Sequence, residues 1–479
     1  MKSKIVRELP PNAIVGVVGA GAMGAGIAQV AAAAGHSVFL FDSAPGAAKT
    51  GRDRIESGLV KLVSRGKKTE ADVAALLARI TIADNLEDLA PAVLVIEAII
   101  ENIDIKRKVF AALEDIVSPD ALLCTNTSSI SVTAIAADLN RPERFAGMHF
   151  FNPAPVMKLV EVISGLATAT AVNDTLLNTA RSWGKIAVAA KSTPGFIVNR
   201  VARPYYAEAL RLLEEQVASA ATIDAILVGG GGFRMGPFAV MDLIGHDVNY
   251  AVTCSVFDAF YQDPRYRPSL VQKELVDAGW LGRKSGRGFY NYSKGNEASK
   301  PEVLDVQCAM TFDLPPLDGR CFDFQGVRVR RTDGRCAIEY DKDVILYDQT
   351  LNPETATHIA FSVSPDVPRK TVDEFAAALW NQGKSACLLP DWPGLVLMRT
   401  IAMLANEAYE AILHGVAEPE GIDNAMRYGL NYPVGPVAWA NAIGLQTILF
   451  VLDRLHDQTR DPRYRASLGL RMAARVEVA

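Results

Sequence analysis

The chain has 479 residues, more than one hydrophobic core usually serves, so two or three domains are the starting expectation. Its 49 basic and 54 acidic residues give a net charge of −5 and are spread along the chain, which gives no reason to expect a nucleic-acid or membrane partner. Six sparse cysteines without paired CxxC spacing indicate neither a disulfide scaffold nor a metal site, and no apolar window approaches the about 20 residues of a membrane span. We therefore expect a soluble cytoplasmic protein. We interpret the cysteines as packing thiols: Cys124, Cys254, Cys308, Cys321, Cys336 and Cys387.

The N-terminal segment has the pattern of a βαβ unit. Residues Ala13 to Val18 form a short apolar run, which predicts a strand. A glycine turn, Gly19-Ala20-Gly21-Ala22-Met23-Gly24, follows it and opens the alanine-rich helix pattern of Ala25 to Ala34. Residues Ser37 to Phe41 then predict a second strand that ends at Asp42.

Further apolar runs alternate with helical or polar stretches, as in a doubly wound α/β sheet. They lie at Ala92 to Ile96, Leu122 to Cys124, Met148 to Phe151 and Leu159 to Ile163. We expect this Rossmann-like sheet domain to cover residues 1–190.

After Pro194-Gly195 the pattern changes to long amphipathic helices such as Ile197 to Glu215 and Val248 to Asp263, without strand-like alternation. This all-helical pattern occurs twice. Seven identical pairs lie 199 positions apart, since 394 − 195 = 199 and likewise for the rest: Gly195/Gly394, Arg200/Arg399, Glu208/Glu407, Asp224/Asp423, Gly236/Gly435, Pro237/Pro436 and Gly245/Gly444. We therefore expect two tandem helical domains, at residues 191–290 and 384–479.

The segment between the two helical copies, residues 291–383, contains short β-like runs such as Val327 to Val329 and Ile345 to Tyr347. It has no glycine turn like that of the first sheet. The pattern fits either a reduced remnant of a sheet domain or a packed linker.

The glycine turn points to a dinucleotide. A GxGxxG turn alone is a weak motif, but here it follows a strand, opens a helix and precedes an acid at the end of the next strand. The glycines let the backbone approach a pyrophosphate at the helix N-terminus, while Asp42 can accept hydrogen bonds from ribose hydroxyls. Because Asp42 has no adjacent arginine and would repel a 2′-phosphate, we expect NAD rather than NADP.

His149 lies at the end of one apolar run and Glu161 lies in the next. Two strands joined by a Pro-containing loop would set these residues side by side. A carboxylate that holds the second ring nitrogen makes histidine a better base. Considered alone, His149 also fits a buried core histidine.

Asn126-Thr127-Ser128-Ser129 follows the strand at Leu122, at the carboxyl edge where doubly wound sheets bind ligands. The Ser128 hydroxyl can donate to a substrate oxygen, and it equally fits a turn or a helix cap. Asn199, one turn into the helix after Pro194-Gly195, has a similar alternative as a helix-surface residue.

Four stretches of sequence resemble the 3-hydroxyacyl-CoA dehydrogenase family. They are GAGAMGAGIAQVAAAAGH, NTSSISVTAIA, RFAGMHFFNPAPVMKLVEVI and TPGFIVNR. The likeness is dense over residues 13–290 and resumes more weakly over 372–470. The length and the doubled helical domain resemble the bacterial members that act on 3-hydroxybutyryl-CoA or 3-hydroxyadipyl-CoA.

This resemblance implies a role for each matching residue. It makes His149 the catalytic base and Glu161 its orienting partner, and it makes Ser128 and Asn199 the binders of the substrate oxygen. Contacts to the adenosine and pyrophosphate of NAD would come from Asp42 and from the turn residues Gly19, Ala20, Gly21, Ala22, Met23 and Gly24. Contacts to the nicotinamide would come from Glu101, Lys106, Ser128, Asn152 and Lys284.

The contacts to coenzyme A are less defined, because Gly58 stands where relatives often carry a serine. Basic residues remain available for its phosphates, Arg65 and Lys106 among them; the others are Arg52, Arg54, Lys61, Lys67 and Lys68. Each also fits a solvated helix face.

The resemblance implies NAD-dependent, reversible oxidation of an (S)-3-hydroxyacyl-CoA to the 3-oxoacyl-CoA, in fatty-acid or aromatic-acid degradation. The alternatives are another hydroxy-acid dehydrogenase of this architecture and a catalytically inactive NAD-binding protein. The second helical copy has Met398 in place of Asn199 and Asn441 in place of Asp242. We expect it to have no active site and to act as an internal partner of the first copy, with a homodimer left open.

Overall fold

The computed structural model describes residues 8–293, 299–305, 312–340 and 342–478. The chain divides into two compact units, and each unit is formed by two separate segments of the sequence. The N-terminal unit comprises Met1–Val198 together with Gly415–Leu430, and the C-terminal unit comprises Asn199–His414 together with Asn431–Ala479. Cys308 lies outside the described residues.

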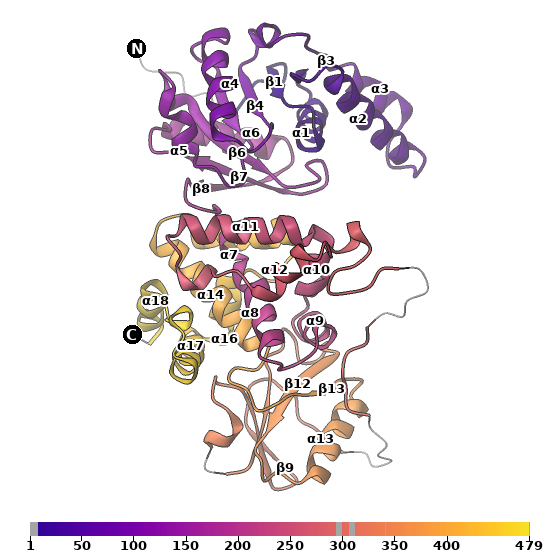
Figure 1. Cartoon of the computed structure of the whole chain (residues 1–479), viewed down its shortest axis with the longest axis vertical. Coiled ribbons are helices and arrows are strands. Elements are labelled where there is room, and N and C mark those ends of the chain that lie inside the picture. Colours follow the sequence, from indigo (N-terminus) through magenta and orange to yellow (C-terminus); the bar gives the residue numbers. More distant parts are fainter. Residues whose placement is uncertain (1–7, 294–298, 306–311, 341, 479) are drawn as a thin grey trace. The chain divides into compact units, whose positions relative to one another are not determined.

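The N-terminal unit is built on an eight-stranded sheet with the order β3-β2-β1-β4-β5-β6-β7-β8 (Figure 1). Its strands are β1 (Ile14–Val18), β2 (Ser37–Phe41), β3 (Ile80–Ile82), β4 (Leu94–Glu97), β5 (Leu122–Thr125), β6 (Phe145–Phe150), β7 (Leu159–Ser164) and β8 (Ile186–Lys191). All neighbours are parallel except β6 and β7, which are antiparallel. The expected Rossmann-like sheet is confirmed.

Helices connect these strands and pack on the sheet. They are α1 (Ala22–Ala33), α2 (Ala47–Val63), α3 (Glu70–Leu77), α4 (Ile103–Ile116), α5 (Val132–Ile135) and α6 (Thr170–Ser182). One more helix, α15 (Pro419–Leu430), belongs to the second helical repeat in sequence but packs on β7 and β8. The Lys191 amide at the end of β8 donates to the Val416 carbonyl just before α15.

The helices of the C-terminal unit form the two helical copies. The first copy contains α7 (Val198–Val201), α8 (Arg203–Glu214), α9 (Ala220–Gly229), α10 (Pro237–Ile244), α11 (His246–Ala259) and α12 (Leu270–Asp277). The second contains α14 (Leu397–Leu413), α16 (Pro436–Ile443), α17 (Leu445–Thr459) and α18 (Leu468–Val478).

The single long helix expected from Ile197 to Glu215 is instead two helices, α7 and α8, which meet at Ala202. Pro204 lies in the first turn of α8, where its missing N–H removes the hydrogen bond that would continue one helix into the next. The helix expected from Val248 to Asp263 ends at Ala259. Tyr261 and Gln262 beyond it have positive φ angles, which an α-helix does not accommodate.

A second sheet lies between the two helical copies in sequence. Its strands are β9 (Phe322–Phe324), β10 (Val327–Arg331), β11 (Val344–Tyr347), β12 (His358–Val363) and β13 (Ser385–Leu388), and α13 (Arg369–Asn381) connects the last two. The order is β13-β12-β11-β10-β9. Val329, Ile345 and Phe361 are fully buried in a core of their own, so residues 291–383 include a sheet domain rather than only a packed linker.

The second sheet repeats the last four strands of the first. In both sheets a parallel pair is followed by an antiparallel pair and then by another parallel pair, so β10 to β13 correspond to β5 to β8. In the first sheet His149 lies opposite Glu161. In the second, the Asp348 amide donates to the Ala360 carbonyl over 2.9 Å, and Ala360 lies 199 positions after Glu161. Asp348 therefore stands at the position of His149.

The described cysteines are free thiols in three environments. Cys124 and Cys387 are buried, Cys254 and Cys336 are partly buried, and Cys321 is exposed. The interpretation as packing thiols is wrong for Cys321. Within the described ranges no single helix is long and apolar enough to cross a membrane, and the α16–α17 pair meets those criteria only jointly, bent by 96°.

Candidate active site

The glycine turn between β1 and α1 is shaped by close backbone contacts. Gly19 has φ +98°, and a Cβ at Gly24 would stand 1.7 Å from the Gly19 carbonyl oxygen, so no other residue fits at Gly24 without moving the turn. Gly21 differs, because a Cβ there would meet nothing within 4 Å. The protein itself does not require glycine at Gly21, and the open space lies at the N-cap of α1, where amides and helix dipole favour an anion.

Asp42 lies at the end of β2, beside this turn. One carboxylate oxygen accepts from the Ala20 amide over 2.7 Å, and the other accepts from the Ala44 amide over 2.9 Å. These bonds fix the carboxylate next to the turn, while the side chain stays half-buried. The arrangement suits a carboxylate that accepts further hydrogen bonds from ribose hydroxyls.

His149 on β6 and Glu161 on β7 form a buried pair. The antiparallel register places them directly opposite each other, and His149 Nδ1 lies 2.7 Å from Glu161 Oε2. Glu161 is fully buried and His149 is 6% exposed. Phe151 and Phe196 pack on the imidazole, at ring distances of 4.5 and 5.9 Å. With Nδ1 held by the carboxylate, Nε2 is the nitrogen left to accept a proton.

The other oxygen of Glu161 holds the backbone at the start of α7. Glu161 Oε1 accepts from the amides of Ile197 and Val198 over 3.1 and 2.9 Å. These bonds satisfy two donors that a helix N-terminus leaves unpaired. Glu161 is therefore fixed by the backbone on one side while it orients His149 on the other.

The loop after β5 is organised by Glu101, whose side chain projects from the loop before α4. Glu101 Oε1 accepts from the Thr127 hydroxyl over 2.5 Å, from the Ser128 amide over 2.9 Å and from the Ser129 amide over 3.1 Å. Burial disfavours the charge of Glu101, but the hydrogen bond from Thr127 and the charge of Lys106 lower its pKa below the ordinary value. Glu101 and Ser128, both expected at the cofactor, are thus joined in one network.

Lys106 is not placed as expected for a coenzyme A contact. Its side chain is 1% exposed, and its ammonium group lies 2.6 Å from Glu97 Oε1 and 3.3 Å from Glu101 Oε2. A lysine paired in this way has no exposed charge to offer a phosphate, which argues against a coenzyme A contact at Lys106. The sequence reading missed Glu97, which is fully buried at the end of β4 and also accepts from the Thr125 hydroxyl.

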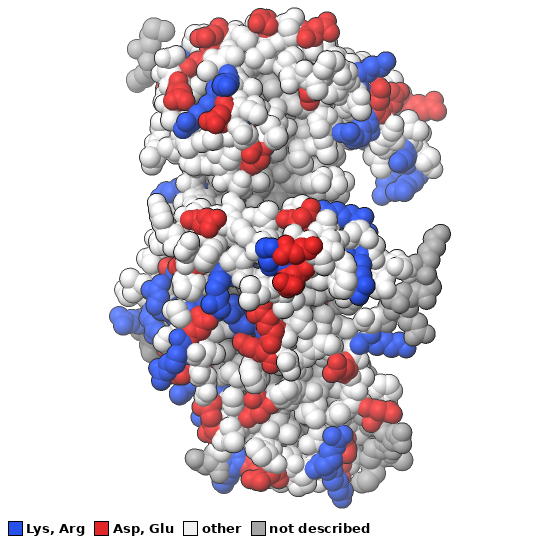
Figure 2. All heavy atoms as spheres, viewed as in Figure 1, with Lys and Arg blue, Asp and Glu red and all other residues white. Residues whose placement is uncertain are grey.

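The structure also shows a role for Asn126 that sequence reasoning missed. Asn126 Oδ1 accepts from the Phe150 amide over 2.8 Å, which ties the end of β5 to the end of β6 beside His149. The remaining expected residues of this unit, Asn152 and Arg65, are both exposed. Arg65 lies two residues after the end of α2, and Lys and Arg side chains gather with acidic ones around α2 and α3 (Figure 2).

Two expected site residues belong to the C-terminal unit. Asn199 lies in α7, and its carbonyl oxygen accepts from Arg203 Nε over 2.8 Å. Lys284 lies in a short turn after α12, where it forms an exposed ion pair with Asp247 at 2.5 Å.

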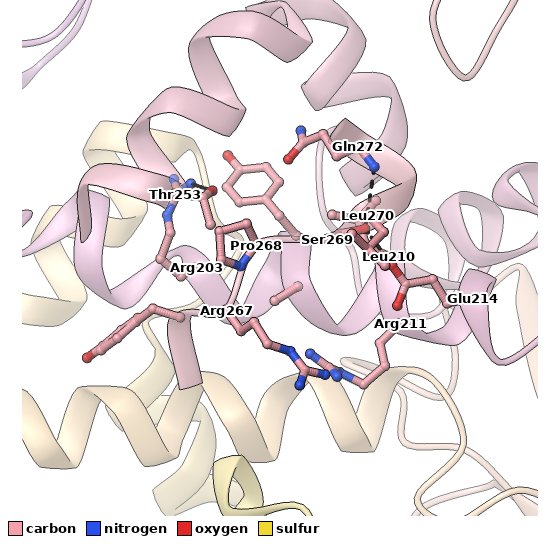
Figure 3. A pocket seen from close by; sticks show the side chains of 13 residues that line it. Arg203, Leu210, Arg211, Glu214, Thr253, Arg267, Pro268, Ser269, Leu270 and Gln272 are labelled. Atoms are coloured by element: carbon pink, nitrogen blue, oxygen red, sulfur yellow. Dashed lines mark hydrogen bonds between the residues drawn. The ribbon is translucent and has the colours of Figure 1, made fainter. Parts of the chain in front are cut away.

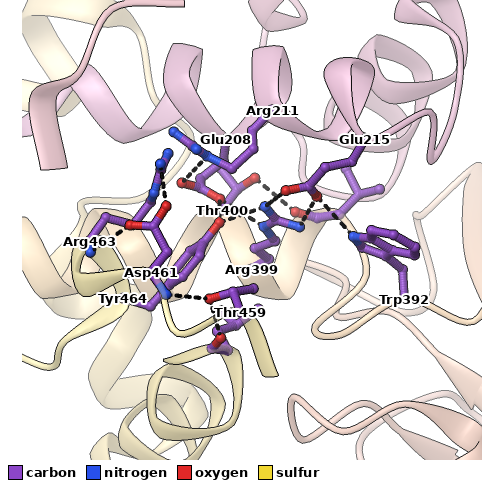
Figure 4. Close-up of polar contacts among 12 residues, drawn as sticks. Glu208, Arg211, Glu215, Trp392, Arg399, Thr400, Thr459, Asp461, Arg463 and Tyr464 are labelled. Carbon is purple, nitrogen blue, oxygen red and sulfur yellow. Dashed lines mark hydrogen bonds and ion pairs between the residues drawn. The ribbon is translucent and has the colours of Figure 1, made fainter. Parts of the chain in front are cut away.

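The two helical copies in the C-terminal unit are joined by reciprocal buried ion pairs. Arg200 Nε of the first copy lies 2.5 Å from Glu407 of the second, and Arg399 Nε of the second lies 2.7 Å from Glu208 of the first. Tyrosines repeat the pattern, since Tyr266 donates to Glu407 over 2.6 Å and Tyr464 donates to Glu208 over 2.9 Å. Figure 4 shows the second of these, with Arg399 and Tyr464 at Glu208. The same residues thus contact one another in both directions, as at a twofold interface between identical subunits.

The sheet, the turn with its open Gly21, the acid at Asp42 and the buried histidine–carboxylate pair together define an NAD-dependent dehydrogenase. Family models agree. The NAD-binding domain of 3-hydroxyacyl-CoA dehydrogenase matches residues 14–193, and the C-terminal domain of that family matches residues 195–292 and again 394–477. The reduced Rossmann-fold domain of 3-hydroxybutyryl-CoA dehydrogenase matches residues 329–393.

Two relatives resemble the chain over nearly its whole length, and a shorter one resembles its first part. The 3-hydroxyadipyl-CoA dehydrogenase of Escherichia coli strain K12 is 46% identical, over 97% of this chain and 98% of that protein. A crystal structure of 3-hydroxybutyryl-CoA dehydrogenase from Escherichia coli K12 has a TM-score of 0.92 at 45% identity, covering 98% of this chain and 99% of that one. The shorter (S)-3-hydroxybutyryl-CoA dehydrogenase of Ralstonia eutropha, at 43% identity and TM-score 0.57, covers 59% of this chain and 99% of its own.

The chain belongs to the 3-hydroxyacyl-CoA dehydrogenase family. It is an NAD-dependent oxidoreductase, and the cofactor expected from the glycine turn and Asp42 is confirmed as NAD.

Proposed function

We propose that this chain oxidises the 3-hydroxyl group of an (S)-3-hydroxyacyl-CoA to the ketone, with His149 as the base and Glu161 as its orienting partner. The observation that carries the proposal is the buried contact of 2.7 Å between His149 Nδ1 and Glu161 Oε2. Positive charge that develops on the imidazole is stabilised by this carboxylate. The amides of Ile197 and Val198 keep the carboxylate in place while the proton moves.

The proton and the two electrons of the reaction take separate routes. His149 Nε2 removes the proton of the 3-hydroxyl, and NAD, when bound, accepts the hydride from C3. In the reverse direction His149 returns the proton to the ketone oxygen. The resemblance to the family assigns the positioning of the substrate oxygen to Ser128 and Asn199.

The turn at Gly19 to Gly24 fits the pyrophosphate of NAD, because a side chain at Gly21 would fill the space at the N-cap of α1. Asp42 would accept from the adenosine ribose. Glu101, Lys106, Ser128, Asn152 and Lys284 keep the nicotinamide contacts that the family resemblance implies for them. A clear preference for NAD over NADP tests Asp42, and equal kcat/KM with the two cofactors would contradict this assignment.

The phosphates of coenzyme A need exposed cations, which the segment around α2 provides. Arg65 and Lys61 are exposed there, near the end of α2. We assign the coenzyme A contact to Arg65 and not to Lys106, whose charge is buried and paired. Substitution Arg65→Met should raise KM for the acyl-CoA and leave kcat within a few-fold.

We also propose that the second helical copy is an internal partner of the first, in place of the second subunit that a single-copy relative would need. The reciprocal pairs of Arg200 with Glu407 and of Arg399 with Glu208 support this proposal. A chain cut near residue 295 should expose the apolar face around these pairs and dimerise or aggregate. A truncated chain that stays monomeric, stable and active would contradict the proposal.

The two full-length relatives are named for substrates that differ at the end of the acyl group, 3-hydroxyadipyl-CoA and 3-hydroxybutyryl-CoA. Both fit the proposed chemistry at C3, and degradation of fatty or aromatic acids supplies such thioesters. The test is a panel of both substrates with NAD, followed by the absorbance of NADH. No NADH with any 3-hydroxyacyl-CoA would overturn the proposed function.

A further inference from the structure

The first helical copy contains a cavity of about 420 Å³ (Figure 3). Helices α8, α11 and α12 and the segment from Tyr266 to Ser269 line it. Three arginines face this space: Arg203 is buried, Arg211 is mostly buried and lies 3.8 Å from Glu208, and Arg267 is exposed. The cavity is thus lined by three cations, one of them buried, and by one carboxylate, Glu214, which accepts from the Ser269 hydroxyl.

Arg203 is a buried cation without a carboxylate partner. It is 5% exposed, its Nε donates to the Asn199 carbonyl over 2.8 Å and its Nη1 donates to the Thr253 hydroxyl over 3.0 Å. The guanidinium also lies over the Tyr206 ring. Among the described residues no carboxylate comes within ion-pair distance of it. Burial of an unpaired charge is strongly unfavourable, and such groups in cavities mark binding sites.

Arg200, three residues earlier, is also buried, but its charge is balanced by the carboxylate of Glu407. Burial opposes its charge, but Glu407 outweighs that effect and raises the pKa of Arg200. For Arg203 burial prevails and lowers the pKa. The charge of Arg203 therefore lacks a counter-charge that the protein supplies to its neighbour.

The second helical copy shows whether the helical fold itself requires an arginine at the position of Arg203. Ala402 stands 199 positions after Arg203, and Ala405 stands 199 positions after Tyr206. Pro264-Arg265-Tyr266 recurs as Pro462-Arg463-Tyr464, 198 instead of 199 positions later. Thr253 therefore corresponds to Leu452 or, at the shorter spacing, to Val451, and both are apolar and buried in α17. The same helical fold thus forms with small or apolar residues there. The buried arginine is not needed for the fold and occurs in the copy that follows the NAD-binding sheet.

The place of Arg203 in the helix relates it to the substrate. Arg203 follows Asn199 by four residues, across the junction of α7 and α8 at Ala202, and its Nε lies 2.8 Å from the Asn199 carbonyl oxygen, so the guanidinium stands beside Asn199. In a six-carbon acyl group, bonds of about 1.5 Å put carbons 3 and 6 about 4 Å apart. With the 3-oxygen at Asn199, a carboxylate at carbon 6 comes within reach of the guanidinium that stands beside Asn199. The guanidinium is a bidentate partner for such a group.

We propose that Arg203 binds the terminal carboxylate of the acyl group, so that the substrate class is a 3-hydroxyacyl-CoA whose six-carbon chain ends in a carboxylate. This inference rests on the proposed function, because it takes Asn199 as the residue at the substrate oxygen. Thr253 is a positioning residue, since its hydroxyl holds Nη1 of Arg203.

The test compares two thioesters with the same number of carbons, 3-hydroxyadipyl-CoA and 3-hydroxyhexanoyl-CoA, which end in a carboxylate and a methyl group. Wild-type protein should favour the carboxylate. In Arg203→Met the ratio of the two kcat/KM values should fall by about 10- to 100-fold, the range expected for a lost hydrogen bond to a charged group. Arg203→Lys should restore part of the ratio, because it returns the charge without the planar fork.

Arg267→Met removes the same charge from an exposed residue of the same cavity, and its ratio should stay at the wild-type value. Thr253→Val keeps the charge of Arg203 but removes the hydroxyl that holds it, so it should lower the ratio by less than Arg203→Met does. This variant replaces Arg203→Met in the test if Arg203→Met fails to fold. A ratio unchanged in both Arg203→Met and Thr253→Val, or a fall in Arg267→Met alone, would overturn the inference. Wild-type protein that produces no NADH from either thioester would instead overturn the proposed function. A further control measures inhibition by free adipate with each thioester as substrate. If adipate inhibits wild type equally with both thioesters and Arg203→Met abolishes this inhibition, Arg203 belongs to a separate anion site and the inference is contradicted.

Discussion

In the first sheet His149 on β6 faces Glu161 on β7, and Glu161 also accepts from the amides that begin α7. In the second sheet the facing positions hold Asp348 and Ala360. Asp348 accepts from the amides of Val396, Leu397 and Met398 at the start of α14. A carboxylate thus holds the next helix in both copies, but it comes from opposite strands.

This comparison separates what the fold needs from what the chemistry needs. Unpaired amides at a buried helix N-terminus require an acceptor in either copy. A histidine is present at the paired position only in the sheet that has the glycine turn. At the paired positions the second sheet keeps the anchoring carboxylate and has no histidine, which supports a structural role for the second copy.

The largest expected effect follows from removing the base. His149→Ala should lower kcat by about 10²- to 10⁴-fold, the usual contribution of a general base, and leave the Kd for NAD within a few-fold. Glu161→Gln should be milder, because the imidazole remains. The matched control is His358→Ala in β12 of the second sheet, which should retain wild-type kcat. Turnover of His149→Ala close to wild type would eliminate the proposed mechanism.

The next effect tests the symmetry of the helical copies. Arg200→Met and Arg399→Met each remove the nearest cation of a buried glutamate, which keeps a tyrosine donor and a second, more distant arginine. Breaking a buried ion pair in this way typically costs about 3 to 5 kcal/mol. Urea unfolding should show losses of this size, similar for the two variants. Arg454→Met, an exposed position on α17, is the control and should change little. A large loss in one variant with none in the other would contradict the twofold arrangement.

Asp348 gives a pH-dependent test. Burial raises the pKa of Asp348 to about 6, above the about 3.9 of an unfolded chain. Because the folded state holds this proton more tightly, the associated stability is fully present below about pH 4 and is lost as the pH rises through about 6. Two units correspond to about 3 kcal/mol. The free energy of unfolding of wild type, minus that of Asp348→Asn, should fall by this order between pH 4 and 7; a difference independent of pH would refute it.

A smaller effect distinguishes two glycines of the cofactor turn. Gly21→Ala adds a methyl group in open space, so it should leave the unfolding midpoint unchanged and weaken NAD by about tenfold, or about 1.4 kcal/mol. Gly24→Ala would place the methyl against the Gly19 carbonyl and should lower the midpoint itself. Calorimetric titration and thermal unfolding check both variants. Unchanged NAD affinity in Gly21→Ala would show that the pyrophosphate does not approach there.

Much of this arrangement could be predicted from the sequence. The glycine turn and Asp42 follow from local pattern, and the doubled helical domain follows from identities at a constant spacing. The pairing of His149 with Glu161 follows from two neighbouring strands joined by a Pro-containing loop. These features depend on residues close in sequence or on repetition.

Other features depend on contacts distant in sequence, which no local pattern encodes. Lys106 has the composition of a surface cation, and only the fold brings Glu97 beside it. From the sequence, residues 291–383 fit either a sheet domain or a linker. The strands β9 to β13 are short, and only the fold shows that they pair with one another. The membership of α15 in the N-terminal unit depends on packing against β7 and β8, although its sequence repeats a helical copy.

The central claim is that one copy performs the chemistry and the other supports it. Calorimetric titration of the intact chain with NAD tests this claim most directly, since only the first sheet has the turn with Gly21 and Asp42. We expect one NAD per chain, with binding weakened by Gly21→Ala. Two NAD sites per chain, or a site that persists unchanged in Gly21→Ala, would contradict it.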